Sequence, residues 1–223
     1  MPPIYQIYFA IAFGAYLLGS IPFGYLVARA KGIDIRTVGS GNIGATNAMR
    51  VLGKPAGILV LLMDALKGYA ACALLAPYIY HWMFSHMFLG SFPAYSETAK
   101  LKYETIAGVA AVLGHNYTCW LKFKGGKGVA TTAGVFLALA PIPLLIAAVV
   151  FFIMVAATRY ISVGSIAAAI ALPVTVWIIM PASVFFCIVT TLLGVLAIYK
   201  HKGNIQRLMA GTENRFGQKK ESK

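Results

Sequence analysis

Four short polar segments interrupt an otherwise apolar sequence, and they hold the residues that can do chemistry. Each combines glycine with Lys, Arg, Ser, Thr, Asn or His; they are residues 39–50 (GSGNIGATNAMR), 122–128 (KFKGGKG), 159–165 (RYISVGS) and 201–213 (HKGNIQRLMAGTE). Glycine lets a backbone come close to an anion, while Lys and Arg supply positive charge and hydrogen-bond donors. Together the segments predict one anion-binding site at a membrane surface.

The first segment contains a G-x-G-x-x-G match that runs from Gly39 to Gly44. That pattern indicates a dinucleotide site only within a strand–turn–helix unit, and here it follows an apolar stretch, so we reject that interpretation. The same physics still favours an oxyanion, because glycine N–H groups and the start of a helix expected over residues 45–52 attract negative charge. Arg50, about two turns after Asn42, adds a planar guanidinium suited to phosphate.

The second segment predicts another anion site. It is not a Walker A loop, because Gly128 follows Lys127 and position 121 holds leucine, so ATP hydrolysis loses its usual support. Its glycines and lysines come directly before a helix expected to begin at Val129, an arrangement that favours an anion.

Each glycine-rich segment also has a purely structural interpretation. The first can be a tight loop that needs only the conformational freedom of glycine, and the lysines of the second can extend toward water at a membrane boundary. Lysines that extend toward water would not require the glycines within residues 125–128, so this interpretation leaves those glycines unexplained. A tight loop would not require the neutral donors beside the glycines of the first segment, namely Ser40, Asn42, Thr46 and Asn47.

The composition predicts an all-α, polytopic membrane protein. Of the 223 residues 60% are hydrophobic and 11% charged, with a mean hydropathy of +0.78, whereas soluble domains carry about 25% charged residues. The sequence shows no repeat and no linker, which predicts a single domain over residues 1–223 with a flexible tail over residues 211–223. Seven transmembrane helices are expected, at residues 4–28, 56–80, 105–121, 129–140, 144–157, 163–180 and 184–199.

The fourth and fifth expected helices meet at Pro141-Ile142-Pro143, where proline can bend or break a helix. Residues 129–157 can therefore form one bent span or two short ones. Their length suits two short ones.

The distribution of charge predicts the orientation. With seven spans and the N-terminus outside, all four polar segments and most of the 19 Lys and Arg residues fall on one side, which the positive-inside rule makes cytoplasmic, together with the C-terminus. A single bent span would separate the second segment from the third. The net charge of +13 also favours anionic lipids or substrates. Nucleic acid is not expected as a partner, because the basic residues are spread over short loops without a dedicated soluble domain.

The polar segments resemble the signature segments of the bacterial membrane acyl-phosphate:glycerol-3-phosphate acyltransferases. The resemblance runs over nearly the whole chain and is carried by residues 39–50, residues 114–131 (GHNYTCWLKFKGGKGVAT), and His201, Asn204, Arg207 and residues 211–213. It implies transfer of a fatty acyl group from acyl phosphate to the 1-hydroxyl of sn-glycerol 3-phosphate, the first acylation of phospholipid biosynthesis, giving lysophosphatidic acid and phosphate. It also implies a multi-pass protein of the bacterial cytoplasmic membrane, with its active site facing the cytoplasm.

The resemblance also implies roles for individual residues. The donor phosphate is expected at Ser40, Gly41, Asn42, Gly44, Thr46, Gly125 and Gly126. Glycerol 3-phosphate is expected at Arg50, Lys127, Ser165, His201 and Asn204. The residues expected to be catalytic are His201, Lys127 and Arg50.

The residues favour a reaction without an acyl-enzyme, a cofactor or a metal. The sequence has no H-x4-D and no G-x-S-x-G pattern, which disfavours thioester-type and serine-hydrolase chemistry. An acyl phosphate already has a stable leaving group, so orientation of the hydroxyl and stabilisation of charge are the main requirements. Either the departing phosphate or His201 accepts the proton. No cluster of carboxylates is available to hold Mg²⁺.

Three further observations leave alternatives open. Asp64 and Lys67, three residues apart in the second expected span, either neutralise each other or serve the function. Glu213 either orients a basic partner or caps the final turn, and His115 is expected to cap or pack a helix. An anion transporter is the rival class. Transport predicts a repeated half and polar residues near the membrane midplane. This sequence shows no repeat and places its expected site at one face of the membrane, which favours an enzyme. A membrane scaffold would not require these polar segments.

Overall fold

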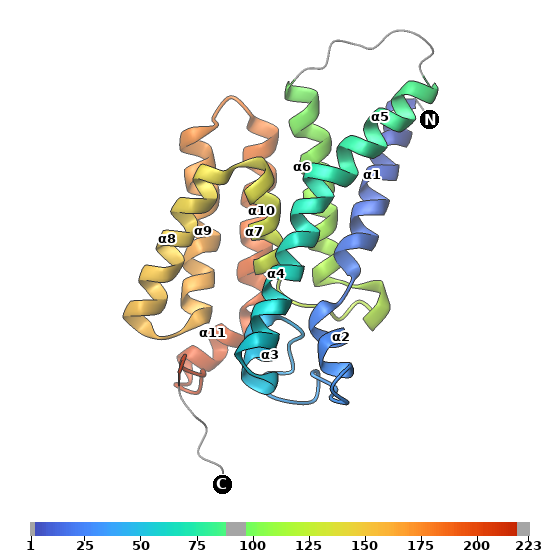
Figure 1. Ribbon diagram of the computed structural model, residues 1–223. Coiled ribbons are helices and arrows are strands. Elements are labelled where there is room, and N and C mark those ends of the chain that lie inside the picture. Colours follow the sequence, from blue (N-terminus) through green and yellow to red (C-terminus); the bar gives the residue numbers. More distant parts are fainter. Residues whose placement is uncertain (1–2, 88–96, 218–223) are drawn as a thin grey trace. The chain divides into compact units, whose positions relative to one another are not determined.

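The computed structural model describes residues 3–87 and 97–217, and all regular elements within them are helices (Figure 1). Most of the predicted tail, residues 211–217, is described, whereas its end and residues 88–96 lie outside the described part. Contacts divide the chain into two units, Met1–Leu139 and Ala140–Lys223, called unit 1 and unit 2 below.

Unit 1 contains seven α-helices among its described residues. They are α1 (Pro3–Ser20), α2 (Phe23–Arg29), α3 (Ala45–Leu52), α4 (Lys54–Ala70), α5 (Ala76–Met87), α6 (Glu97–Asn116) and α7 (Val129–Leu139). A π-helical turn, η1 (Ala71–Leu75), joins α4 to α5 without interruption, and a 3-10 turn, η2 (Cys119–Leu121), follows α6. The first expected span is broken before Pro22, because proline lacks an N–H and disfavours a helical conformation at the residue before it.

Unit 2 contains four helices among its described residues, α8 (Pro141–Thr158), α9 (Ile161–Ile179), α10 (Val184–Lys200) and α11 (Lys202–Met209). α9 packs against both α8 and α10. Close approach depends on glycine, since a Cβ at Gly164 would meet the Phe151 carbonyl oxygen and a Cβ at Gly194 the Ala169 carbonyl oxygen. Small residues at such contacts are typical of membrane helices.

The structure corrects the expected fifth span. α7 and α8 are separate helices, as the length of the stretch suggested, but α8 begins at Pro141 and has 18 residues instead of starting at residue 144. Proline is tolerated in the first turn of a helix, because the N–H groups there have no partner within the helix. Of these two helices, α7 is the short one, with 11 residues.

Four helical stretches among the described residues are long and apolar enough to cross a membrane: Ile4–Arg29, Lys54–Met87, α8 and α9. The bent pair of α10 and α11 makes a fifth if it counts as one span. The other expected spans correspond to α6, whose first turns carry Glu97, Lys100, Lys102 and Glu104, and to α7, which is short. The chain is thus an all-helical, multi-pass membrane protein.

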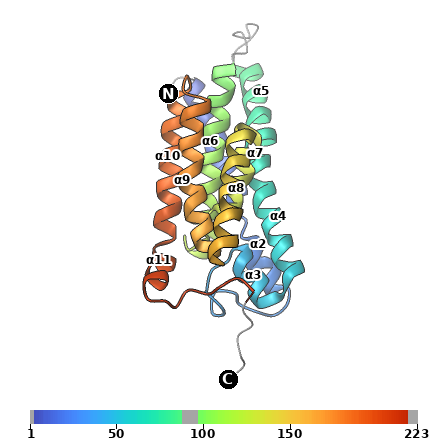
Figure 2. The same cartoon turned by 90° about the vertical axis from the view of Figure 1, so that its left-hand side faces the viewer.

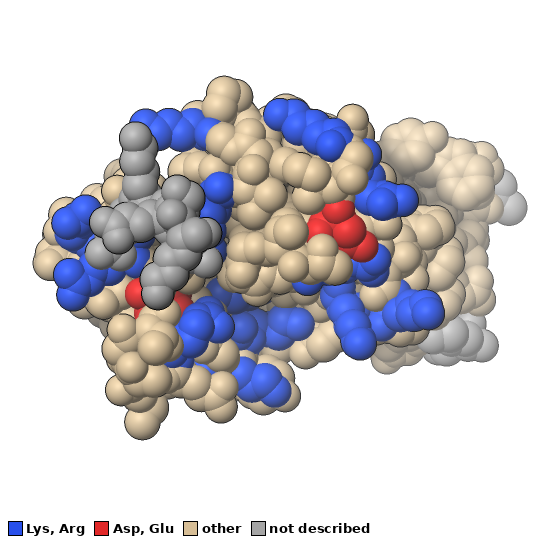
Figure 3. Space-filling model, turned by 90° about the horizontal axis from the view of Figure 1, so that it is seen from below, with Lys and Arg blue, Asp and Glu red and all other residues tan. Residues whose placement is uncertain are grey.

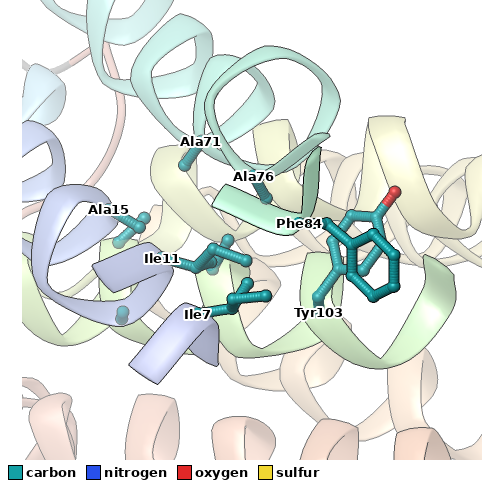
Figure 4. Packing of buried hydrophobic residues seen from close by; sticks show 10 residues of the cluster. Ile7, Ile11, Ala15, Ala71, Ala76, Phe84 and Tyr103 are labelled. Atoms are coloured by element: carbon teal, nitrogen blue, oxygen red, sulfur yellow. The ribbon is translucent and has the colours of Figure 1, made fainter. Parts of the chain in front are cut away.

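The hydrophobic core of unit 1 lies between α1, η1, α5 and α6. Its buried residues include Ile7, Ile11, Ala15, Ala71, Ala76, Phe84 and Tyr103 (Figure 4). α1 and α6 lie very close, because a Cβ at Gly19 would overlap the Ala111 backbone and one at Gly114 the Tyr16 carbonyl oxygen. This core holds α6, whose C-terminal end leads through η2 into the second polar segment.

Both polar segments of unit 1 lie at the same end of that unit. In Figures 1 and 2, α2, α3 and the loop that follows α6 lie at the lower end of unit 1, opposite the N-terminus. Seen from below, Lys and Arg side chains are more frequent on the surface than Asp and Glu (Figure 3). The first and second segments thus lie at the same end of unit 1, and their joining in one anion-binding site stays a prediction.

Candidate active site

Asn47 organises the first glycine-rich segment from within. Its side chain is buried, its Oδ1 accepts the Ser40 N–H at 2.8 Å, and its Nδ2 donates to the carbonyl oxygens of Ile35, Val38 and Asn42 at 3.3, 3.1 and 2.9 Å. The sequence interpretation took Asn47 as a donor for an anion. The structure corrects this, because the amide holds the loop together.

The glycine amides of the first segment are engaged within the loop. The Gly41 N–H donates to the Val38 carbonyl at 3.0 Å, and the Gly44 N–H donates to the Asn42 Oδ1 at 2.8 Å. Gly39 and Gly41 have φ angles of +64° and +70°, which only glycine adopts without strain. The predicted anion contacts therefore cannot come from the Gly41 and Gly44 amides in this conformation. Turn geometry explains Gly39 and Gly41.

The exposed side chains of the first segment remain available for a ligand. Ser40, Thr46 and Arg50 are all exposed. α3 extends over Ala45–Leu52, as the sequence predicted, and so places Thr46 in its first turn and Arg50 in its last. These groups can supply hydroxyl and guanidinium donors to an anion.

The second segment is folded against the end of α6. The Gly125 N–H donates to the Asn116 carbonyl at 3.2 Å, and the Gly126 N–H donates to the His115 carbonyl at 3.0 Å. A Cβ at residue 125 would overlap the His115 carbonyl, and one at residue 126 the His115 ring. The donor-phosphate contacts predicted for Gly125 and Gly126 therefore cannot come from these amides in this conformation, and close packing explains both glycines.

Packing of the glycines positions the lysines of the second segment. Lys122 and Phe123 have φ angles of +53° and +60°, an uncommon conformation for residues with a side chain. Lys122 and Lys124 are exposed, and Lys127 is half-buried. The segment thus presents cations on a constrained backbone.

A buried cluster of ionisable side chains joins α4 to α6. The Lys67 Nζ lies 2.7 Å from the Asp64 Oδ1, and the His115 Nδ1 lies 3.4 Å from the same oxygen. The pairing of Asp64 with Lys67 is confirmed, and a functional role of the pair stays open. Sequence reasoning missed the contact with His115, because no local spacing relates α4 to α6.

Glu213 organises the site residues of unit 2. Its Oε1 accepts hydrogen bonds from the Ser162 Oγ at 2.9 Å and the Asn204 Nδ2 at 2.6 Å, and its Oε2 accepts one from the Arg207 Nε at 2.7 Å. Burial raises the pKa of Glu213, but the hydrogen bonds from Asn204, Arg207 and Ser162 outweigh it and hold the pKa below 4.5. Of the two alternatives, Glu213 orients a basic partner. This contact also joins the third and fourth polar segments.

His201 is 2% exposed and lies between α10 and α11. Its Nδ1 lies 2.8 Å from the Ala197 carbonyl oxygen. Because a carbonyl only accepts, Nδ1 carries the hydrogen, and Nε2 is the basic nitrogen of the neutral ring. Ser165 is also buried, and its hydroxyl donates to the Ile161 carbonyl within α9, so its oxygen can act toward a ligand as an acceptor.

The structure gathers the predicted site residues into two groups. Unit 1 holds Ser40, Gly41, Asn42, Gly44, Thr46, Arg50, Gly125, Gly126 and Lys127, and unit 2 holds Ser165, His201 and Asn204. Within residues 3–87 and 97–217, no three His, Cys, Asp or Glu side chains are grouped as a metal ion would require.

The fold and these groups define an integral membrane protein with cationic, glycine-rich segments at helix ends. The chain belongs to the glycerol-3-phosphate acyltransferase family, whose model matches residues 9–211. It is therefore an enzyme that acylates glycerol 3-phosphate, and the product of that reaction is lysophosphatidic acid.

Similar proteins cover nearly the whole chain. The glycerol-3-phosphate acyltransferase of Trichlorobacter lovleyi is 47% identical over 203 residues, which span 91% of this chain and 94% of the relative. That of Geobacter sulfurreducens is 47% identical over 206 residues, 91% of this chain and 94% of the relative. Among crystal structures, the glycerol 3-phosphate form of PlsY (YgiH), an integral membrane glycerol 3-phosphate acyltransferase, matches with a TM-score of 0.78 and 38% identity, covering 94% of this chain and 96% of PlsY. Its lysophosphatidic acid form matches with a TM-score of 0.76.

Proposed function

We propose that the acyl donor of this enzyme is an acyl phosphate and that the acceptor is the 1-hydroxyl of sn-glycerol 3-phosphate. The observation that carries the proposal is the location of Arg50 and Lys127 on two cationic segments at the same end of unit 1. Both substrates of such a reaction carry a phosphate, and two cationic segments match two phosphates.

The proposal assigns the donor phosphate to Ser40, Gly41, Asn42, Gly44, Thr46, Gly125 and Gly126. Glycerol 3-phosphate is assigned to Arg50, Lys127, Ser165, His201 and Asn204. Since the amides of Gly41, Gly44, Gly125 and Gly126 are bonded within the protein, these glycines shape the two loops. The donor phosphate is held mainly by the exposed Ser40 and Thr46 side chains. The crystal structures of PlsY with glycerol 3-phosphate and lysophosphatidic acid support the choice of ligands.

The chemistry is a direct attack without an acyl-enzyme. The 1-hydroxyl oxygen attacks the carbonyl carbon of the acyl phosphate, an ester bond forms, and the bond to the phosphate oxygen breaks. Arg50 and Lys127 stabilise negative charge on the phosphates. The hydroxyl proton goes to the departing phosphate or to the Nε2 of His201, whose bond to Ala197 fixes the required tautomer. Acyl-protein trapped during turnover would contradict direct attack.

The enzyme is proposed to act as a single domain in a bacterial cytoplasmic membrane, with its N-terminus outside and its C-terminus and active site in the cytoplasm. The positive-inside distribution of Lys and Arg supports this orientation. Labelling of single cysteines introduced at Lys124 and Lys202 tests it, because both should react only from the cytoplasmic side.

The deciding experiment uses purified protein, palmitoyl phosphate and glycerol 3-phosphate without ATP or thioester. Equal amounts of lysophosphatidic acid and phosphate are expected. Palmitoyl coenzyme A in place of the acyl phosphate is the control and should give no product. Activity with the thioester alone would contradict the proposed donor.

A further inference from the structure

Three ionisable side chains meet in the interior of unit 1. Asp64 and Lys67 lie on α4 and His115 on α6, and each is at most 4% exposed. Both the Lys67 Nζ and the His115 Nδ1 contact the Asp64 Oδ1. Charges within a membrane-spanning helix are costly, and apolar residues often replace a buried ion pair without loss of stability. The cluster therefore points to a role other than stability.

Lys67 connects this cluster to the first glycine-rich segment. Its Nζ donates a hydrogen bond of 2.8 Å to the Ile21 carbonyl, at the break between α1 and α2. α2 packs directly on the first segment, because a Cβ at Gly24 would overlap the Ile43 carbonyl oxygen. The location of Ile43 therefore depends on α2 and, through Ile21, on Lys67.

His115 connects the same cluster to the second segment. Its carbonyl accepts the Gly126 N–H, and its Nε2 lies against the Gly126 Cα. On the other side of the ring, Nδ1 is held at the Asp64 carboxylate. Since Lys127 follows Gly126 directly, the location of its backbone depends on His115.

We propose that Asp64, Lys67 and His115 are positioning residues that hold the two glycine-rich segments of unit 1 in a fixed relation to each other. Asp64 is the shared contact of Lys67 and His115. The hydrogen bonds of Lys67 to Ile21 and of Gly126 to His115 suit this task because hydrogen bonds are directional, unlike apolar contacts. The cluster acts through Ile21 and Gly126 and touches no substrate. The inference rests on the proposed function, in which the two segments bind the two phosphates.

The test replaces the ion pair by apolar residues in the full chain. Asp64→Leu combined with Lys67→Met removes both charges at similar side-chain volume. The matched control is Thr105→Val, because Thr105 is buried on α6 and its hydroxyl donates to Leu101 of the same helix. Thermal unfolding, kcat and KM for both substrates, and hydrogen exchange of residues 122–128 are measured in detergent.

We expect the double variant to fold with the Tm of the parent protein, to exchange faster over residues 122–128, and to lose about 100-fold in kcat/KM for glycerol 3-phosphate, as misplaced reactants do. Thr105→Val should match the parent in all three. A folded double variant with the kcat/KM or the hydrogen exchange of the parent would overturn the proposal.

If the double variant does not fold, His115→Gln decides, because it leaves the Asp64–Lys67 pair intact. The same faster exchange and loss of kcat/KM are expected, and parent values of either would overturn the proposal. Lys127→Ala separates the inference from the proposed function: full activity of Lys127→Ala would contradict the function. An inactive Lys127→Ala beside a fully active double variant would remove only the inference.

Discussion

The side-chain amide of Asn204 donates a hydrogen bond to the Glu213 carboxylate across 2.6 Å. Glu213 also accepts hydrogen bonds from Ser162 and Arg207, and its side chain is 7% exposed. The carboxylate therefore fixes the rotamer of Asn204, which is proposed to bind glycerol 3-phosphate, and ties the end of the described chain to α9.

Glu213→Gln is expected to weaken this contact. An amide keeps one acceptor but loses the charge and one of the accepted bonds, so the free energy of unfolding should fall by about 1–3 kcal/mol. The KM for glycerol 3-phosphate should rise, because Asn204 is less firmly oriented. Thermal unfolding and steady-state kinetics measure both, and exposed Glu97→Gln is the control. Parent values of Tm and KM would contradict the role of Glu213.

The same carboxylate predicts a pH dependence of stability. The pKa of Glu213 in the folded protein lies below its ordinary value of 4.5, so the unfolded chain binds the proton more tightly. The contribution to stability is fully present above about pH 4.5 and is lost as the pH falls through the lower folded pKa. The difference in Tm between the parent and Glu213→Gln should therefore shrink on acidification. A constant difference down to the lowest pH at which the protein folds would contradict this.

Arg50→Ala and Lys127→Ala should each lower kcat/KM by about 100-fold or more, because each removes a cation proposed to stabilise phosphate charge. Folding should survive, since Arg50 is exposed and Lys127 half-buried. The control is the nearby exposed Lys54→Ala, which lies outside the polar segments and keeps both proposed cations. Near-normal turnover of either site variant would remove that residue from the site.

Gly126→Ala tests the packing of the second segment. A Cβ at this position would overlap the His115 ring, so the loop must shift, and loss of both stability and activity is expected. Gly14→Ala in α1 is the control, since a Cβ there makes ordinary contacts of 3.4 and 3.5 Å with the Ile79 and Leu75 side chains and should be tolerated. An active and fully stable Gly126→Ala would show that the segment does not require glycine for packing.

Local sequence patterns determined the helices and the residues of the polar segments. α3 follows from the end of the glycine pattern at Gly44, and the apolar helices follow from hydropathy, because backbone groups in a membrane must bond within their own segment. The pairing of Asp64 with Lys67 was also predictable, since residues three apart share one face of a helix. The start of α8 at Pro141 was missed, because proline is as acceptable in a first turn as after a last one.

Tertiary structure alone decided how the polar residues are used. The glycines of residues 125 and 126 bond to carbonyls at the end of α6, and His115 contacts Asp64 on another helix. Glu213 holds Ser162 and Asn204, which come from different elements. The physical reason is that a glycine amide or a carboxylate bonds to whichever group lies within about 3 Å. For groups far apart in the chain, helix packing determines which group that is.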